Sequence, residues 1–193
     1  CSARNITHAG AVGYYTMQAA NRGFVGIVMS ASGPLMAYHG ARVSGVSTNP
    51  LSIAVPSAVN PLLLDMSTSN VALGKVMAAK DAGTSVPEGW GIDAEGSPAT
   101  DPKKIATLTP LGGPKGSGLS LMIEILASVL VSNPVISEAL SGRAAAMNGL
   151  AMALDVKAFT DPDTFARQIA ELVASIKGLP TASGTDEVLM PGE

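Results

Sequence analysis

The chain has 193 residues, of which 47% are hydrophobic and 14% are charged, and its formal net charge is −3 at pH 7. A chain of this length can form one large domain or two small ones with a substantial core. So few charges predict that another domain or subunit covers part of the surface. The slight acidity and the 4% aromatic content argue against nucleic-acid binding, which needs a basic surface.

The numbers of cysteines and histidines and the length of the apolar runs argue against disulfide-stabilised, metal-binding and membrane-spanning proteins. One cysteine cannot form an internal disulfide, and two histidines far apart in the sequence give no metal-ligand cluster. The longest apolar run, 119–131, is interrupted by polar residues and is shorter than the ~20 residues of a membrane span, so we expect a soluble protein. Cys1 leaves two interpretations open, the lipid-modified start of a bacterial lipoprotein or the start of a trimmed chain. The structured look of residues 2–15 favours the trimmed chain.

The first part of the chain predicts a helix, a strand and a long loop. Residues 8–21 suit a helix that Gly23 ends, and the apolar residues 24–29 suit a buried strand. Glycine, serine, proline and alanine dominate residues 30–49. Long loops without regular structure are uncommon and usually functional, so this segment is a candidate binding loop.

Two strands and a helix are expected next. Residues 51–55 and 61–66 predict strands joined by a turn that contains proline. Ser69 or Asn70 is expected to cap the following helix, and Gly83 is expected to end it.

The second half predicts an irregular crossing with Trp90 as its packing anchor, a long apolar helix, a strand and an amphipathic helix. These segments are residues 86–110, 115–131, 149–154 and 161–178. Strands that alternate with helices predict an α/β domain.

The most informative tract is residues 109–120, in which glycines lead into the apolar helix. Pro114 suits the first helical position, the glycines let a ligand approach the backbone, and Lys115 adds a cation beside the unpaired N–H groups expected at a helix start. The tract is a candidate phosphate site; alternatively, the glycines serve close packing and the lysine is solvated. It is not a P-loop, because Gly116 follows Lys115. It is not a dinucleotide fingerprint either, because Leu-Ser-Leu follows Gly118.

Other side chains suited to chemistry lie near the expected element ends. Histidine is well matched to proton transfer near neutral pH, so His8 is a candidate base, or else a cap or a packed polar group. His39 offers the same chemistry in less context. Asp65 ends a strand, where a carboxylate can accept ribose hydroxyls and the following serines can meet phosphate; alternatively, these residues cap the next helix. Thr48 and Asn49 precede a proline, as in a common turn.

Six motifs, taken together, point to one family. They are residues 5–15 (NITHAGAVGYY), 48–50 (TNP), 64–69 (LDMSTS), 74–76 (GKV), 110–116 (PLGGPKG) and 191–193 (PGE). In order and spacing they resemble the malate/L-lactate dehydrogenase family, which is unrelated to the Rossmann lactate dehydrogenases.

The resemblance implies an α/β fold with a non-Rossmann NAD(P)-binding domain, in which a mixed sheet is flanked by helices. It also implies hydride transfer between NAD or NADP and a 2-hydroxy acid or 2-oxo acid of the malate, lactate, ureidoglycolate or sulfolactate type. Because piperideine-2-carboxylate reductases are relatives, NADPH-dependent reduction of a cyclic imino acid is an alternative. A catalytically silent cofactor-binding fragment and a phosphosugar enzyme also stay open.

The same resemblance implies site residues. His8 matches a histidine that takes the substrate hydroxyl proton, and Thr48 and Asn49 match substrate-binding positions. The positions that match cofactor contacts are Ser32, Leu64, Asp65, Met66, Ser67, Lys115, Gly116, Pro191, Gly192 and Glu193.

Two parts of the family are missing from this sequence: an N-terminal helical domain with a Ser-His-Gly segment, and a C-terminal helix after Pro-Gly-Glu. Residues 1–193 are therefore expected to be the cofactor-binding core domain of a larger enzyme. Because some relatives use the histidine of the missing domain as acid or base, His8 has substrate orientation as an alternative role. Relatives pair into dimers, so we expect a cytoplasmic homodimer that binds a small 2-hydroxy or 2-oxo acid, with neither nucleic acid nor a membrane as a partner.

Overall fold

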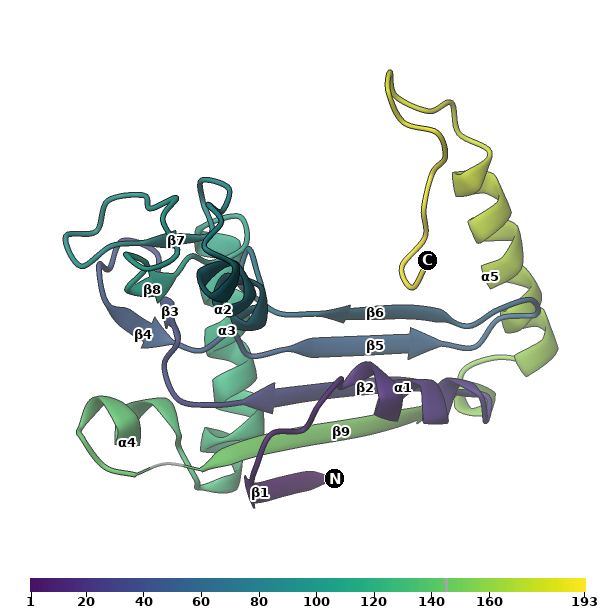
Figure 1. Cartoon of the computed structure of the whole chain (residues 1–193). Coiled ribbons are helices and arrows are strands. Elements are labelled where there is room, and N and C mark those ends of the chain that lie inside the picture. Colours follow the sequence, from purple (N-terminus) through teal and green to yellow (C-terminus); the bar gives the residue numbers. More distant parts are fainter. Residues whose placement is uncertain (145) are drawn as a thin grey trace. The chain divides into compact units, whose positions relative to one another are not determined.

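The computed structural model describes residues 1–144 and 146–193, and the chain divides into two compact units (Figure 1). Unit 1 consists of Cys1–Ala9, Met29–Leu51 and Met66–Leu150. Unit 2 consists of Gly10–Val28, Ser52–Asp65 and Ala151–Glu193.

The strands of the described residues form two sheets. One sheet has the strand order β1-β9-β2-β5-β6, and the other has the order β4-β3-β8-β7. In the second sheet β3 runs antiparallel to β4 and parallel to β8, so this sheet is mixed. The strands are β1 (Ser2–Ile6), β2 (Phe24–Ala31), β3 (Met36–Ala37), β4 (Ser44–Val46), β5 (Leu51–Val55), β6 (Leu62–Met66), β7 (Gly91–Ile92), β8 (Thr107–Leu108) and β9 (Met147–Asp155).

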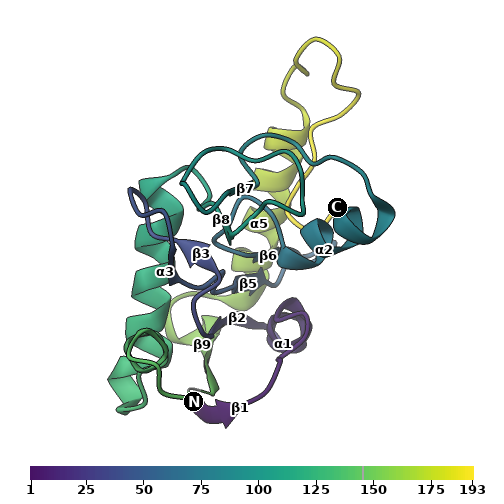
Figure 2. The ribbon, with the colours of Figure 1, turned by 60° about the vertical axis from the view of Figure 1, so that its left-hand side comes forward.

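Helices accompany both sheets, as the two ribbon views show (Figures 1 and 2). The helices are α1 (Gly13–Ala20), α2 (Leu73–Ala82), α3 (Pro114–Ala127), α4 (Ile136–Leu140) and α5 (Pro162–Lys177), with short 3₁₀ turns η1 (Val129–Val131) and η2 (Val156–Ala158). The expected fold class, α/β with a mixed sheet flanked by helices, is confirmed.

Elements with strong local signals were predicted correctly. The two strands expected over 51–55 and 61–66 are β5 and β6. α5 begins where the Asp161 carboxylate accepts a 2.8 Å hydrogen bond from the Thr164 N–H, with proline at the first helical position. Gly83 ends α2 with a left-handed φ of 67°.

Elements that depend on distant partners were not predicted. The first helix begins at Gly13 rather than near His8, because the chain leaves β1 at Ile6 and Gly10 has a left-handed φ of 72°. The expected loop over 30–49 contains β3 and β4, and α4 was not anticipated. The long apolar helix ends as an α-helix at Ala127, and Ser132, with a φ of 55°, ends the 3₁₀ turn that follows.

The expected side-chain cap of α2 is wrong. Its N-cap is Ala72, which makes no side-chain hydrogen bond. Ser69 Oγ instead donates to the Val71 carbonyl at 2.7 Å, and Asn70 Nδ2 donates to the Gly89 carbonyl at 2.9 Å. Both polar side chains therefore organise the loop before the helix.

The core of unit 1 lies around the smaller sheet. Its buried members are Met36, Val46, Val71, Val76, Leu108 and Ile136. Trp90 packs against this cluster, as expected for the anchor of the irregular crossing, and so does Ile105.

Helix α3 buries polar side chains and exposes apolar ones. Its buried residues include Ser117, Ser120 and Glu124, together with glycine, alanine and one isoleucine. Large apolar side chains are exposed on α3 and η1, namely Leu121, Met122, Ile125, Val129 and Leu130. Residues Pro114–Val131 also form a stretch long and apolar enough to cross a membrane by length and composition, a test that core helices of soluble proteins pass as well. Large exposed apolar patches are typical of surfaces that another domain or subunit covers.

Candidate functional site

The glycine turn before α3 brings two predicted segments of unit 1 together. A Cβ atom at Gly116 would lie 2.4 Å from the Thr68 carbonyl oxygen, so only glycine allows this approach. The Leu111 N–H donates to the same carbonyl at 3.0 Å, and Ser69 and Pro110 form a β-bridge. The segment that follows Met66, the last residue of β6, and begins with Ser67 is thus held against the start of α3.

The backbone of this turn differs from the expected anion site. The N–H groups of Lys115, Gly116 and Ser117 donate to the carbonyls of Gly112, Leu111 and Gly113, at 3.4, 2.7 and 3.3 Å. The expected unpaired N–H groups beside Lys115 are therefore absent from these positions, because the glycine turn folds back and supplies its own acceptors. The turn needs glycine for another reason, since Gly112 and Gly113 have φ values of 57° and 62°.

The side chain of Lys115 is the charged group of this turn. Lys115 is exposed, and its ammonium makes no hydrogen bond or ion pair with the described part of the chain. An unpaired ammonium at the start of a long helix attracts an anion through its own charge and through the helix dipole. Any phosphate contact here is therefore made by the side chain.

A buried polar network in unit 1 fixes Ser32. The Ser32 N–H donates to Asn49 Oδ1 at 3.1 Å, and Asn49 Nδ2 donates to the Ser120 carbonyl at 2.9 Å. Ser32 Oγ lies 2.5 Å from Ser47 Oγ, and Ser120 Oγ donates to the Ser47 carbonyl at 2.7 Å. Asn49 is fully buried. The predicted substrate residue Asn49 thus ties the β2–β3 connection to α3.

Thr48 and Ser67 lie close to these groups along the chain of hydrogen bonds. The Thr48 carbonyl accepts the Thr68 N–H at 3.0 Å. Ser67 Oγ is half-buried and accepts a 3.0 Å hydrogen bond from Ser69 Oγ. Unit 1 therefore gathers Ser32, Thr48, Asn49, Met66, Ser67, Lys115 and Gly116 through bonded neighbours.

The two histidines of unit 1 have different surroundings. His8 is exposed and follows β1, outside any helix. The His39 N–H donates to Ser117 Oγ at 3.0 Å, and a Cβ atom at Gly113 would lie 3.3 Å from His39 Nδ1. His39 thus packs on the glycine turn, a position that its sequence context did not reveal.

In unit 2, Asp65 near the end of β6 is bound on one side only. Its Oδ2 accepts the Gly13 N–H at the start of α1 at 2.8 Å. Among the described residues Oδ1 has no hydrogen-bond partner. The alternative in which Asp65 caps the helix that follows it is wrong, because it caps α1, which precedes it.

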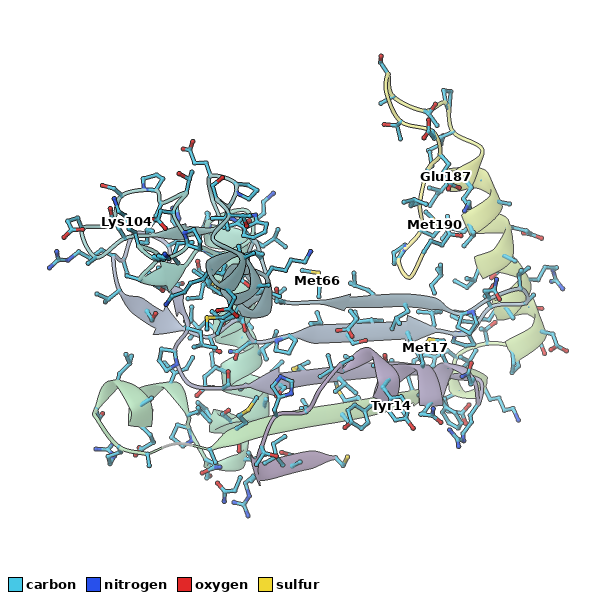
Figure 3. The ribbon with its side chains drawn as sticks, in the orientation of Figure 1. Tyr14, Met17, Met66, Lys104, Glu187 and Met190 are labelled. Atoms are coloured by element: carbon cyan, nitrogen blue, oxygen red, sulfur yellow. The ribbon has the colours of Figure 1, made fainter. Side chains whose placement is uncertain are left out.

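The C-terminal turn of unit 2 packs on β6. The Leu63 N–H donates to the Pro191 carbonyl at 3.2 Å, and Gly192 has a φ of 101°, with its Cβ position 3.3 Å from Leu63. Pro191, Gly192 and Glu193 are thereby brought beside the predicted residue Leu64. Figure 3 labels Met190 and Glu187 on the segment that leads to this turn.

An ion pair ties this turn to α5. Both carboxylate oxygens of Glu193 accept from Lys177 Nζ, at 2.7 and 2.6 Å, and the Met190 N–H donates to Oε2 at 2.9 Å. The hydrogen bonds from Lys177 and Met190 lower the pKa of Glu193. The turn, α5 and the loop before β6 enclose a groove of about 420 Å³ with mainly apolar walls.

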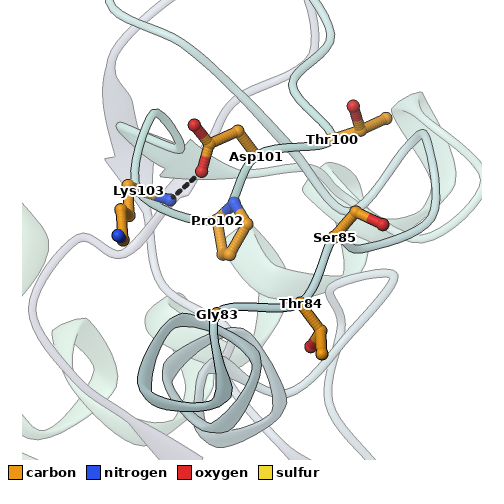
Figure 4. Close-up of a pocket in the computed structure, with 7 residues that line it drawn as sticks. All are labelled: Gly83, Thr84, Ser85, Thr100, Asp101, Pro102 and Lys103. Atoms are coloured by element: carbon orange, nitrogen blue, oxygen red, sulfur yellow. Dashed lines mark hydrogen bonds between the residues drawn. The ribbon is translucent and has the colours of Figure 1, made fainter.

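Two other pockets lie in unit 1, and the candidate residue His39 lines one of them. One of about 370 Å³ is lined by His39, Arg42 and Glu95, among others. The other, of about 340 Å³, lies between the end of α2 and the 100–103 turn (Figure 4), where Asp101 accepts the Lys103 N–H. Within the described ranges, no group of three His, Cys, Asp or Glu side chains is placed to hold a metal.

Sequence reasoning missed Gly13 and Glu124. Gly13 is the partner of Asp65, and its signal was a glycine inside a predicted helix. Glu124 Oε1 accepts the N–H groups of Val135 and Ile136 at 2.8 and 3.0 Å, so a buried carboxylate joins α3 to the start of α4. Its signal was a charged residue at helical spacing from Ser120 and Ser128 in an apolar run.

Comparison with protein families matches the whole chain. Residues 1–193 match the model of the malate/L-lactate dehydrogenase family. The NAD(+)-dependent ureidoglycolate dehydrogenase of Escherichia coli K12 is 33% identical over 192 residues, which are 96% of this chain and 55% of the relative. The L-sulfolactate dehydrogenase of Methanocaldococcus jannaschii is 35% identical over 98% of this chain and 56% of its own length. The chain thus spans about half the length of the curated relatives it matches.

Solved structures agree with this match. The M. jannaschii sulfolactate dehydrogenase superposes with a TM-score of 0.85 at 33% identity, over all of this chain and 57% of that one. The Δ1-piperideine-2-carboxylate reductase of Pseudomonas syringae superposes with a TM-score of 0.81 at 30% identity, over 98% of this chain and 57% of that one.

Proposed function

Because the chain belongs to the malate/L-lactate dehydrogenase family, we propose that it is the cofactor-binding core of an NAD(P)-dependent oxidoreductase. The reaction is hydride transfer between the cofactor and a 2-hydroxy acid or 2-oxo acid of the malate, lactate, ureidoglycolate or sulfolactate type. The observation that supports it best is the match over the entire chain to dehydrogenases whose names specify such acids. When bound, the nicotinamide ring of the cofactor would accept or donate the hydride.

The free polar groups of the chain fit this cofactor. The unpaired Lys115 ammonium suits a phosphate oxygen, and the Asp65 oxygen left without a partner in the described chain suits a ribose hydroxyl. The further predicted cofactor contacts are Ser32, Met66, Ser67 and Gly116 among the residues of unit 1, and Leu64, Pro191, Gly192 and Glu193 among those of unit 2.

The substrate side is assigned to unit 1. The exposed imidazole of His8 takes the proton of the substrate hydroxyl during oxidation and returns it during reduction. Thr48 lies on the substrate side, and the buried Asn49 acts there by holding the Ser32 backbone. Because longer relatives contain other histidines, a role for His8 in orienting the substrate is the alternative.

A second candidate reaction is NADPH-dependent reduction of a cyclic imino acid. The structural likeness to Δ1-piperideine-2-carboxylate reductase favours it. Both reactions add a hydride to a carbon that bears a carboxylate, so they share the cofactor contacts and differ only in the substrate.

The proposed enzyme is a cytoplasmic homodimer. Support for the dimer comes from the exposed apolar side chains of Leu121, Met122, Ile125, Val129 and Leu130 on α3 and η1, whereas the buried face of α3 is polar. A second copy of the same face is an apolar partner that the chain itself supplies. A cytoplasmic location fits an enzyme that uses soluble nicotinamide cofactors and small acids.

Titration of NADH and NADPH into the purified chain tests this function, with nicotinamide fluorescence as the readout. We expect saturable binding of at least one of them. A panel of 2-oxo acids and cyclic imines then separates the two reactions by cofactor oxidation. Absence of saturable binding by either cofactor contradicts the proposal, and protection of the Lys115 region by sugar phosphates alone indicates a phosphosugar enzyme.

A further inference from the structure

We propose that Gly13 is a positioning residue for Asp65. Its N–H group and its lack of a side chain fix the carboxylate through one oxygen and leave the other oxygen available for a ligand hydroxyl. This inference rests on the proposed role of Asp65 in cofactor binding, and all of its parts belong to unit 2.

The contact between the two residues is closer than any side chain permits. The Gly13 N–H donates to Asp65 Oδ2 at 2.8 Å. A Cβ atom at Gly13 would lie 2.6 Å from the same oxygen and 3.1 Å from Asp65 Cβ and Cγ. Real Cβ atoms do not approach heavy atoms within 3 Å, so any other residue at this position pushes the carboxylate away.

Helix α1 is a rigid platform for this donor. Thr16 Oγ1 donates to the Gly13 carbonyl at 3.0 Å and accepts from Ser52 Oγ on β5 at 2.7 Å. Thr16 and Ser52 are fully buried. A Cβ atom at Gly26 on β2 would lie 2.7 Å from the Thr16 carbonyl oxygen, so the helix sits directly on that strand. The position of the Gly13 N–H is therefore set by two strands.

Charge favours the same arrangement. The N-cap residue Val12 makes no side-chain hydrogen bond, and the first turn of α1 contains no acidic residue. Asp65, from β6, is thus the carboxylate at the positive end of this helix. The hydrogen bond restricts rotation of the Asp65 side chain, so the carboxylate does not have to be ordered when a ligand binds.

The test compares Gly13→Ala with Asp65→Ala by the dissociation constant of NADH for the full chain. We expect both variants to raise this constant by a similar factor, on the order of tenfold, since each removes the same oriented contact. Gly74→Ala is the matched control, because Gly74 also lies in the first turn of a helix but has open space at its Cβ position. This control is expected to leave the constant unchanged.

The double variant tests whether Gly13 acts through Asp65. Asp65→Ala removes the oxygen that lies 2.6 Å from a Cβ at Gly13 and leaves only the Asp65 Cβ position, at 3.1 Å. The double variant therefore keeps the test valid if Gly13→Ala alone misfolds. We expect Gly13→Ala to add no further loss of affinity in the Asp65→Ala background. Where Asp65→Ala by itself weakens NADH binding, an additive loss, or a folded Gly13→Ala protein with wild-type affinity, overturns the inference.

A cofactor-free measurement separates this inference from the proposed function. The amide resonance of Gly13 in an NMR spectrum is expected to shift on Asp65→Asn, whereas the amide of Gly74 stays in place. If Asp65→Ala leaves NADH affinity unchanged while the Gly13 resonance shifts, the cofactor role of Asp65 is wrong and its positioning stands. If the resonance does not move, the positioning is wrong.

Discussion

Lys115, Asp65 and Glu193 are charged residues of the proposed cofactor contacts, and they differ in what binds them. The Lys115 ammonium and one Asp65 oxygen have no partner in the described chain, whereas Lys177 and the Met190 N–H occupy both oxygens of Glu193. A free charge gains the most from a new ligand, because it gives up no protein contact. Lys115 and Asp65 are therefore expected to contribute more to cofactor affinity than Glu193.

Substitution of Lys115 tests this argument directly. We expect Lys115→Ala to raise the dissociation constant of the cofactor by about tenfold or more, which corresponds to the ~1.5–3 kcal/mol of one charge-assisted contact. Lys104→Ala removes the same charge from an exposed position of unit 1 (Figure 3) and is the control. If Lys115→Ala binds NADH and NADPH as tightly as Lys104→Ala does, Lys115 makes no cofactor contact and the glycines of the turn serve close packing.

Asn49 is expected to matter first for stability. Its side chain is fully buried and bonds both the Ser32 N–H and the Ser120 carbonyl. Asn49→Ala removes the acceptor of the Ser32 N–H and one of the donors to the Ser120 carbonyl, so we expect the free energy of unfolding to fall by about 1–3 kcal/mol. Asn21→Ala, at an exposed helix end, is expected to change it by less than ~0.5 kcal/mol. Urea denaturation of the two variants measures the difference, and an unaltered midpoint for Asn49→Ala contradicts the structural role.

At the scale of elements, the sequence predicted those whose signals are local. α5 has a cap, a proline and a closing glycine within its own sequence, and β5 has a short apolar run between turns. The starts of α1 and α2 were wrong, because α1 is capped by a residue of β6 and the serine and asparagine before α2 bond to loop carbonyls. The candidate site was predicted only in part for the same reason, because its contacts join distant parts of the sequence. Motif order pointed to Asp65 and Lys115, but their partners depend on chain crossings that no local pattern encodes.

The cap of α5 makes its stability depend on pH. The hydrogen bond from the Thr164 N–H lowers the pKa of Asp161 below its ordinary value. A carboxyl whose pKa is lowered by folding stabilises the folded state above its unfolded pKa, near 4, and this contribution is lost as the pH falls through the lower, folded pKa. Asp161→Asn keeps a good cap but cannot ionise. We therefore expect the melting temperatures of the wild type and Asp161→Asn, followed by circular dichroism, to lie closer together at pH 2 than at pH 7. A constant difference between them would show that Asp161 acts only as a neutral cap.

At the scale of the whole molecule, the low content of charged residues has a structural counterpart. Polar side chains occupy the buried face of α3 because Ser120 Oγ donates to the Ser47 carbonyl and Glu124 Oε1 accepts from the start of α4. The apolar side chains of the helix are consequently left on its outer face. The low charge content predicts a covered surface, and the outer face of α3 is the surface that we propose for it.

A charge on this face tests the proposed homodimer. Ile125 is 39% exposed at the middle of the apolar face, and in an isologous interface each substitution enters twice. Burial of two unpaired carboxylates disfavours association, so we expect Ile125→Glu to raise the dimer dissociation constant by about a hundredfold or more. Leu172→Glu places the same charge on α5, at a side chain that is 52% exposed, and is expected to leave the dimer intact. Sedimentation velocity of the three proteins measures the assembly. A monomeric wild type contradicts the proposed dimer. If Ile125→Glu is still a dimer, the interface does not lie on the apolar face of α3.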